Sequence, residues 1–97
     1  MVKDRSILDL LALIDLASNG WISVDHWDAD LCAIGIAKMG DPRRLVYVST
    51  FERLPGRYDY ECEVKAGPNA EDYVTVDSGE DVDLERLRQV LRRHLGG

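Results

Sequence analysis

Residues 57–65 read Arg57-Tyr58-Asp59-Tyr60-Glu61-Cys62-Glu63-Val64-Lys65. Charged side chains occupy every odd position of this stretch, and apolar or aromatic side chains occupy every even position. A period of two is typical of a β-strand that buries one face and exposes the other to water. The exposed face would then carry three carboxylates, Asp59, Glu61 and Glu63, spaced about 7 Å apart along the strand.

The segments on either side of this strand predict an α+β fold. Apolar residues at helical spacing predict a first helix, with Ser6 as its N-cap and Gly20 after its last turn. A second helix is expected between Asp83 as N-cap and Gly96. Short connections between the runs in between predict an antiparallel meander of four or five strands. We expect the N-terminal and C-terminal helices to pack on the sheet and to leave the three carboxylates on its outward face.

The sequence defines the bounds of the other strands less clearly. Residues 21–37 are rich in β-branched and aromatic side chains, and they fit either one long bent strand or a short hairpin, because Asp28-Ala29-Asp30 interrupts the run. Residues 39–44 contain glycine and proline and predict a turn. A strand is then expected over 45–51, and a short last strand over 73–76.

Length and charge restrict the classes of function. The chain has 97 residues, which fit a single domain over 1–97, and a net charge of −6. Residues 57–85 hold ten acidic and two basic side chains, whereas residues 86–97 hold four arginines and no acid. Such an acidic sector argues against nucleic acid as a ligand and favours a basic partner. The alternative is that the acidic surface only confers solubility.

Nothing in the sequence predicts secretion or membrane insertion. The start of the chain is charged, and Asp9 and Asp15 break the apolar stretch that follows. No segment approaches the roughly 20 apolar residues of a membrane-spanning helix. Two cysteines, Cys32 and Cys62, are too few to suggest a disulfide framework. We therefore expect a cytoplasmic protein.

Only residues Asp25–Asp30 resemble a catalytic or metal site. In a continuous strand His26, Asp28 and Asp30 would share one face, where an imidazole and two carboxylates could converge on a cation. The stretch lacks the further ligand positions of a calcium loop, so a solvated bend is the alternative. Cys62 is a poor nucleophile because its acidic neighbours raise a thiol pKa. We expect no enzymatic activity and no cofactor.

The candidate binding residues are the carboxylates of the acidic sector and one aromatic side chain. Trp27 is either a core residue or a half-exposed anchor for a partner. The predicted partner-binding set is Asp59, Glu61, Glu63, Glu71, Asp72, Asp77, Trp27, Asp28 and Asp30.

The chain resembles the immunity proteins of bacterial toxin–immunity systems, including those of contact-dependent growth inhibition. The resemblance lies in its size, its acidity, its order of elements, the carboxylate-rich strand and the stretch Gly20-Trp21-Ile22-Ser23-Val24-Asp25. It implies tight binding to a cognate toxin domain, often a nuclease, whose active site is blocked. A small interaction domain that forms homodimers through its sheet edge is the alternative, and an enzyme or metal-binding protein using Asp25–Asp30 is a third.

Overall fold

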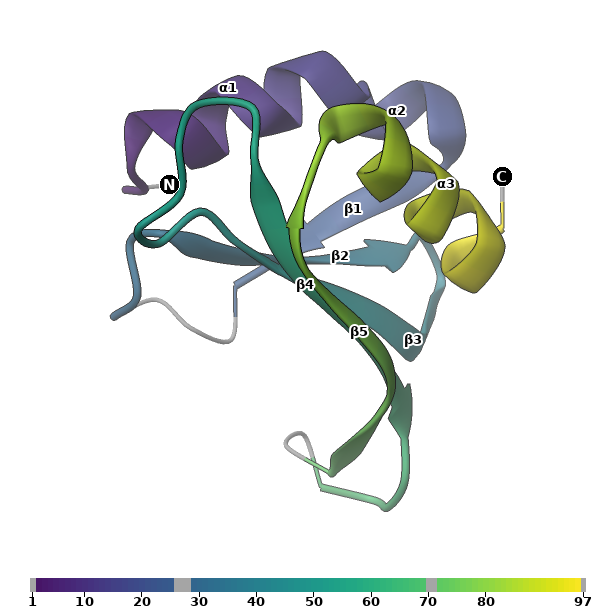
Figure 1. Ribbon diagram of the computed structural model, residues 1–97. Coiled ribbons are helices and arrows are strands. Elements are labelled where there is room, and N and C mark those ends of the chain that lie inside the picture. The colour runs from purple at the N-terminus through teal and green to yellow at the C-terminus, as the bar shows by residue number, and fades with distance from the viewer. Residues whose placement is uncertain (1, 26–28, 70–71, 97) are drawn as a thin grey trace.

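Five antiparallel strands form one sheet in the order β1-β2-β3-β4-β5, with helices on one side of it (Figure 1). The computed structural model describes residues 2–25, 29–69 and 72–96. The elements are α1 (Arg5–Ile14), α2 (Leu16–Asn19), β1 (Trp21–Val24), β2 (Ala33–Lys38), β3 (Asp41–Ser49), β4 (Tyr58–Lys65), β5 (Tyr73–Val82) and α3 (Leu84–Leu95). This arrangement confirms the predicted α+β meander with an N-terminal and a C-terminal helix.

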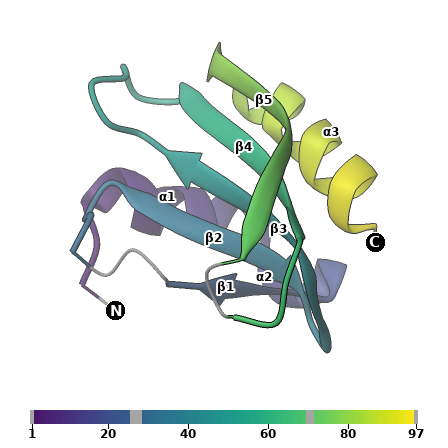
Figure 2. The ribbon, with the colours of Figure 1, turned by 90° about the horizontal axis from the view of Figure 1, so that it is seen from below.

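The core lies between the sheet and the helices. Alternate residues of the central strands point toward α1 and α3, so that Val46, Val48, Tyr60 and Cys62 are buried. The helices contribute the other side of the core through Leu10, Ile14, Leu87, Val90, Leu91 and Leu95. Viewed from below, β1 and β2 lie in front of α1, so the opposite sheet face, here called the outer face, carries no helix (Figure 2). No helix in the described part of the chain is long and apolar enough to cross a membrane.

The predicted helix ends are partly correct. The N-cap of α1 is Asp4 and not Ser6, because the Asp4 carboxylate accepts the backbone N–H of Ser6 at 3.0 Å. A left-handed residue at Asp15 separates α1 from α2, and Gly20 (φ 72°) ends α2 as expected. The start of α3 is confirmed, since the Asp83 carboxylate accepts the N–H of Arg86 at 2.8 Å.

Of the two alternatives left open for residues 21–37, the structure shows the hairpin, with β1 and β2 paired. The other strands differ from the sequence-based expectations in their bounds. The turn predicted over 39–44 is shorter, since β3 begins at Asp41. Pro42 fits there because it falls in a gap in the ladder, where no strand partner needs its missing N–H. The last strand continues to Val82 instead of ending at residue 76, as an edge strand with two register shifts.

Candidate functional site

The predicted row of carboxylates lies on the outer face of β4. Asp59, Glu61 and Glu63 point away from the helices, because their neighbours Tyr58, Tyr60 and Cys62 fill the core. Pairing with β3 sets their surroundings: Leu45 lies opposite Glu63, Tyr47 opposite Glu61, and Ser49 opposite Asp59. The alternation that predicted the strand therefore placed these side chains on the correct face.

Asp59 is occupied by contacts within the protein. The Nε of Arg53, from the loop between β3 and β4, donates to its carboxylate at 2.8 Å. The backbone N–H of Asp81 donates to the same carboxylate oxygen at 2.9 Å. The hydrogen bond to Asp59 raises the pKa of the Arg53 guanidinium. Asp59 thus ties the β3–β4 loop to the end of β5.

Glu61 and Glu63 have no such compensation. Within residues 2–25, 29–69 and 72–96, neither carboxylate forms an ion pair or a side-chain hydrogen bond. Partial burial raises the pKa of Glu63, and the negative charge of Glu61 raises it further. Two like charges therefore lie side by side on the sheet without a counter-ion from the described chain.

Asp30 approaches the same place from the segment before β2. Burial raises the pKa of Tyr47, and the negative charges of Asp30 and Glu61 add to the effect. Tyr47 is thus close to both carboxylates, although they are far apart in sequence. A hollow of about 240 Å³ lies next to Tyr47, and its lining includes Asp59, Glu61 and Glu80. We call Asp30, Asp59, Glu61, Glu63 and Glu80 the acidic surface.

The structure separates two further predicted residues, Asp72 and Asp77, from the acidic surface. The Asp72 carboxylate accepts the N–H of Asn69 at 3.0 Å and shapes the β4–β5 turn. Asp77 pairs with Cys62 across the strands, and its carboxylate accepts a hydrogen bond from Arg93 of α3 at 2.8 Å, so it lies on the helix side. Trp27, Asp28 and Glu71 lie outside the described residues.

The sequence analysis did not identify two side chains that lie in or beside the acidic surface. Tyr47 and Glu80 were not assigned to any site, although Tyr47 alternates with the buried Val46 and Val48. That alternation is the signal that could have placed Tyr47 beside the carboxylate row.

The catalytic and metal alternatives gain no support from the described residues. Asp25 forms an ion pair with Lys3 at 2.8 Å, and no group of three or more metal-binding side chains occurs in the part of the chain that the structure covers. Burial, followed by the charge of Asp77, raises the pKa of Cys62 to about 11. A thiol with that pKa is protonated at neutral pH and is a weak nucleophile.

Comparison of the chain with protein-family models, with curated proteins and with solved structures found no match.

Proposed function

We propose that this protein is a cytoplasmic inhibitor that binds a basic protein through the acidic surface and has no catalytic activity of its own. The observation that carries the proposal is the pair Glu61 and Glu63, two adjacent carboxylates without a counter-ion among the described residues. Such a pair costs stability in the free protein, and a cation from a partner would relieve that cost. A charged face of this kind also raises the rate of encounter with a partner of opposite charge.

The class of partner follows from the sequence resemblance together with the charge. Immunity proteins of toxin–immunity systems block a cognate toxin domain, and we propose that this chain does the same. A nuclease is the preferred target, because nuclease sites use basic residues to attract phosphate. A row of carboxylates can occupy the same basic residues. No cofactor or nucleic acid takes part in this mechanism.

The first test is capture of partners from the native lysate with a tagged protein, at low and at moderate salt. We expect one basic polypeptide in stoichiometric amount, with less retained as the salt concentration rises. The captured polypeptide should be toxic or nucleolytic alone and inactive in the complex. Absence of a stoichiometric basic partner at both salt concentrations would contradict the proposal.

Charge reversal tests whether the acidic surface is the contact. We expect Glu61→Lys with Glu63→Lys to weaken binding of the captured partner by about 100-fold or more. The reason is that close interfacial charge pairs couple by about 1.5 kcal/mol or more each, and 1.4 kcal/mol is a tenfold change in Kd. The salt dependence of Kd should also become flatter.

The control for charge reversal carries the same change in net charge elsewhere. Glu52→Lys with Glu85→Lys alters two exposed carboxylates, one in the β3–β4 loop and one at the start of α3. This double variant should bind nearly as tightly as the natural protein. Equal losses of affinity in the two double variants would mean that only the overall charge matters and that the acidic surface is not the contact.

A homodimer is the second candidate, and one observation favours it. Strand β5 is a ten-residue edge strand, and Val74 and Val76 on it are 49% and 57% exposed. An exposed strand edge with apolar side chains can pair with a second copy of the chain. Sedimentation of the purified protein over a range of concentrations should then give a mass that rises to twice that of the single chain.

A further inference from the structure

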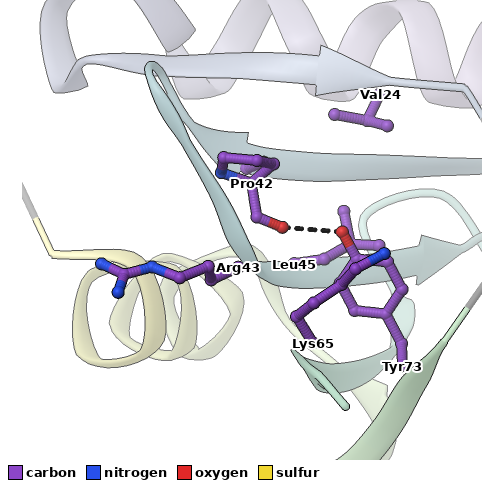
Figure 3. Close-up of a pocket in the computed structure, with 7 residues that line it drawn as sticks. Val24, Pro42, Arg43, Leu45, Lys65 and Tyr73 are labelled. Carbon is purple, nitrogen blue, oxygen red and sulfur yellow. Dashed lines mark hydrogen bonds between the residues drawn. The ribbon is translucent and has the colours of Figure 1, made fainter. Parts of the chain in front are cut away.

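A second hollow lies on the same outer face, beside the acidic surface. Its volume is about 320 Å³, at the small end of the range for ligand pockets. The lining residues are Val24, Ala37, Pro42, Arg43, Leu45, Lys65 and Tyr73 (Figure 3). They come from all five strands of the sheet, so the pocket is a product of the fold rather than of one loop.

The pocket has an apolar floor and a fixed wall. Ala37 and Leu45 are only 2% and 1% exposed although they point away from the helices. The wall is Tyr73 of β5, whose hydroxyl donates a hydrogen bond to the carbonyl of Pro42 at 2.6 Å (Figure 3). The Nζ of Lys65 lies 5.0 Å from the centre of the Tyr73 ring and also donates to the carbonyl of Asn69. These contacts hold the wall in place over the floor.

The two cations at the rim do not make this an anion site. The Arg43 side chain points away from Tyr73 (Figure 3), and its Nε donates to the Asp41 carboxylate at 2.9 Å. The Lys65 ammonium is directed to a backbone carbonyl and to an aromatic ring. What remains open to a ligand is apolar surface, which favours an aliphatic or aromatic group.

The pocket continues into the acidic surface along β4. Leu45 of the floor lies directly opposite Glu63, and Tyr47 lies opposite Glu61. Residues on one face of a strand follow each other at about 7 Å, so Glu63 and then Glu61 lie one and two such steps along β4 from Lys65 at the rim of the pocket. An extended segment has the same spacing between alternate side chains. The apolar pocket and the two carboxylates are therefore spaced like alternate side chains of an extended peptide.

We propose that the pocket receives one large apolar side chain of the basic partner, and that arginine or lysine residues two and four positions away pair with Glu63 and Glu61. Since the partner is the basic protein of the proposed function, this site depends on that function. An apolar anchor in a pocket beside charged contacts is typical of the residues that dominate the affinity of protein interfaces. The carboxylates would then set the rate of encounter, and the pocket would set the lifetime of the complex.

Synthetic peptides test the site without the natural partner. The probe is a short peptide with a central leucine and arginines two and four residues to either side. A matched peptide has alanine in place of leucine. Each is titrated into the ¹⁵N-labelled protein, and amide shifts are followed by NMR. We expect the leucine peptide to shift the amides of Val24, Ala37 and Leu45 as well as those of Glu61 and Glu63. The alanine peptide should shift only the glutamate amides and bind at least about tenfold more weakly.

The outcomes separate this site from the proposed function. Equal affinity of the two peptides, with shifts confined to Glu61 and Glu63, would overturn the pocket and leave the acidic surface intact. No shifts at Glu61 or Glu63 with either peptide would overturn both.

A pair of variants tests the same site from the protein side. Val24→Trp should fill the pocket and reduce the affinity for the leucine peptide to that for the alanine peptide. Val2→Trp makes the same change at an exposed residue outside the pocket and the acidic surface, and it should leave the affinity unchanged. If the affinity for the leucine peptide persists in folded Val24→Trp, the pocket is not the site. If Val24→Trp does not fold, the difference in affinity between the leucine and alanine peptides for the natural protein still tests whether the pocket is the site.

Discussion

Replacement of Glu63 by glutamine is expected to stabilise the free protein at neutral pH. Partial burial raises the pKa of Glu63, and the charge of Glu61 raises it further. A raised pKa means that the folded chain disfavours the ionised carboxylate, so the charge lowers stability at every pH above the folded pKa. A shift of one full unit would correspond to about 1.4 kcal/mol. Because solvent still reaches this side chain and screens it, we expect a gain on the order of 0.5 kcal/mol, or roughly 2–4 °C in Tm.

The pH dependence of stability is a second test of whether Glu63→Gln stabilises the protein for the stated reason. The advantage of Glu63→Gln should be present at pH 7 and should shrink as the pH falls through the folded pKa toward 4.5, the ordinary pKa of a glutamate. Below that value the carboxyl is protonated in both the folded and the unfolded states. Thermal or urea unfolding at pH 7 and pH 4 measures this difference directly.

Two further variants are the controls. Asp59→Asn removes an acceptor used by Arg53 and by the N–H of Asp81, and it should lower the free energy of unfolding by about 1–3 kcal/mol. Glu52→Gln changes an exposed carboxylate, and its free energy of unfolding should stay within about 0.5 kcal/mol of that of the natural protein. A loss of stability in Glu63→Gln similar to that in Asp59→Asn, or a gain independent of pH, would refute the reasoning.

The remaining predictions concern the core. Cys62, with a pKa of about 11 and 1% exposure, should resist a thiol reagent at pH 8 until the protein unfolds, and rapid reaction of both cysteines in the native state would contradict this. Gly79→Ala should lower the free energy of unfolding by roughly 1–3 kcal/mol, because the added Cβ would lie 2.4 Å from the Tyr60 ring. Ser78→Ala, at an exposed neighbour, is the control in urea unfolding, and equal midpoints for the two variants would show that the ring moves aside.

The parts of the fold that could be predicted are those in which burial fixes the pattern. Strand β4 was recognised because its even positions fill the core and its odd positions do not, so a shift by one residue would bury three carboxylates. The end of β5 was missed for the opposite reason. It lies at the edge of the sheet, most of its side chains are exposed, and two register shifts break its alternation.

The same distinction applies to the site. The faces of Glu61 and Glu63 follow from local alternation, whereas the ion pair of Asp59 depends on how the β3–β4 loop folds back. Simple alternation from Tyr73 would put Asp77 on the outer face. The register shift opposite Cys62 and Glu63 places it on the helix side instead, next to Arg93. The pocket could not be predicted at all, since it depends on Tyr73 of β5 reaching across β4 to Pro42 of β3, two strands that are not neighbours in the sheet.

The position of Glu63 argues for binding rather than for solubility alone. Charge that only confers solubility can lie on an exposed side chain such as Glu80, where it has little effect on stability. Glu63 is less exposed than Glu61. It lies opposite the buried Leu45 and beside a like charge, where its ionised form is disfavoured. Glutamine there would keep a polar side chain without that cost. A carboxylate in this place is useful when a cation arrives beside it, because partial burial also strengthens the attraction between the two charges. The prediction that Glu63→Gln stabilises the free protein while weakening its complex is the direct consequence, and a neutral effect on both would remove this reason to prefer binding.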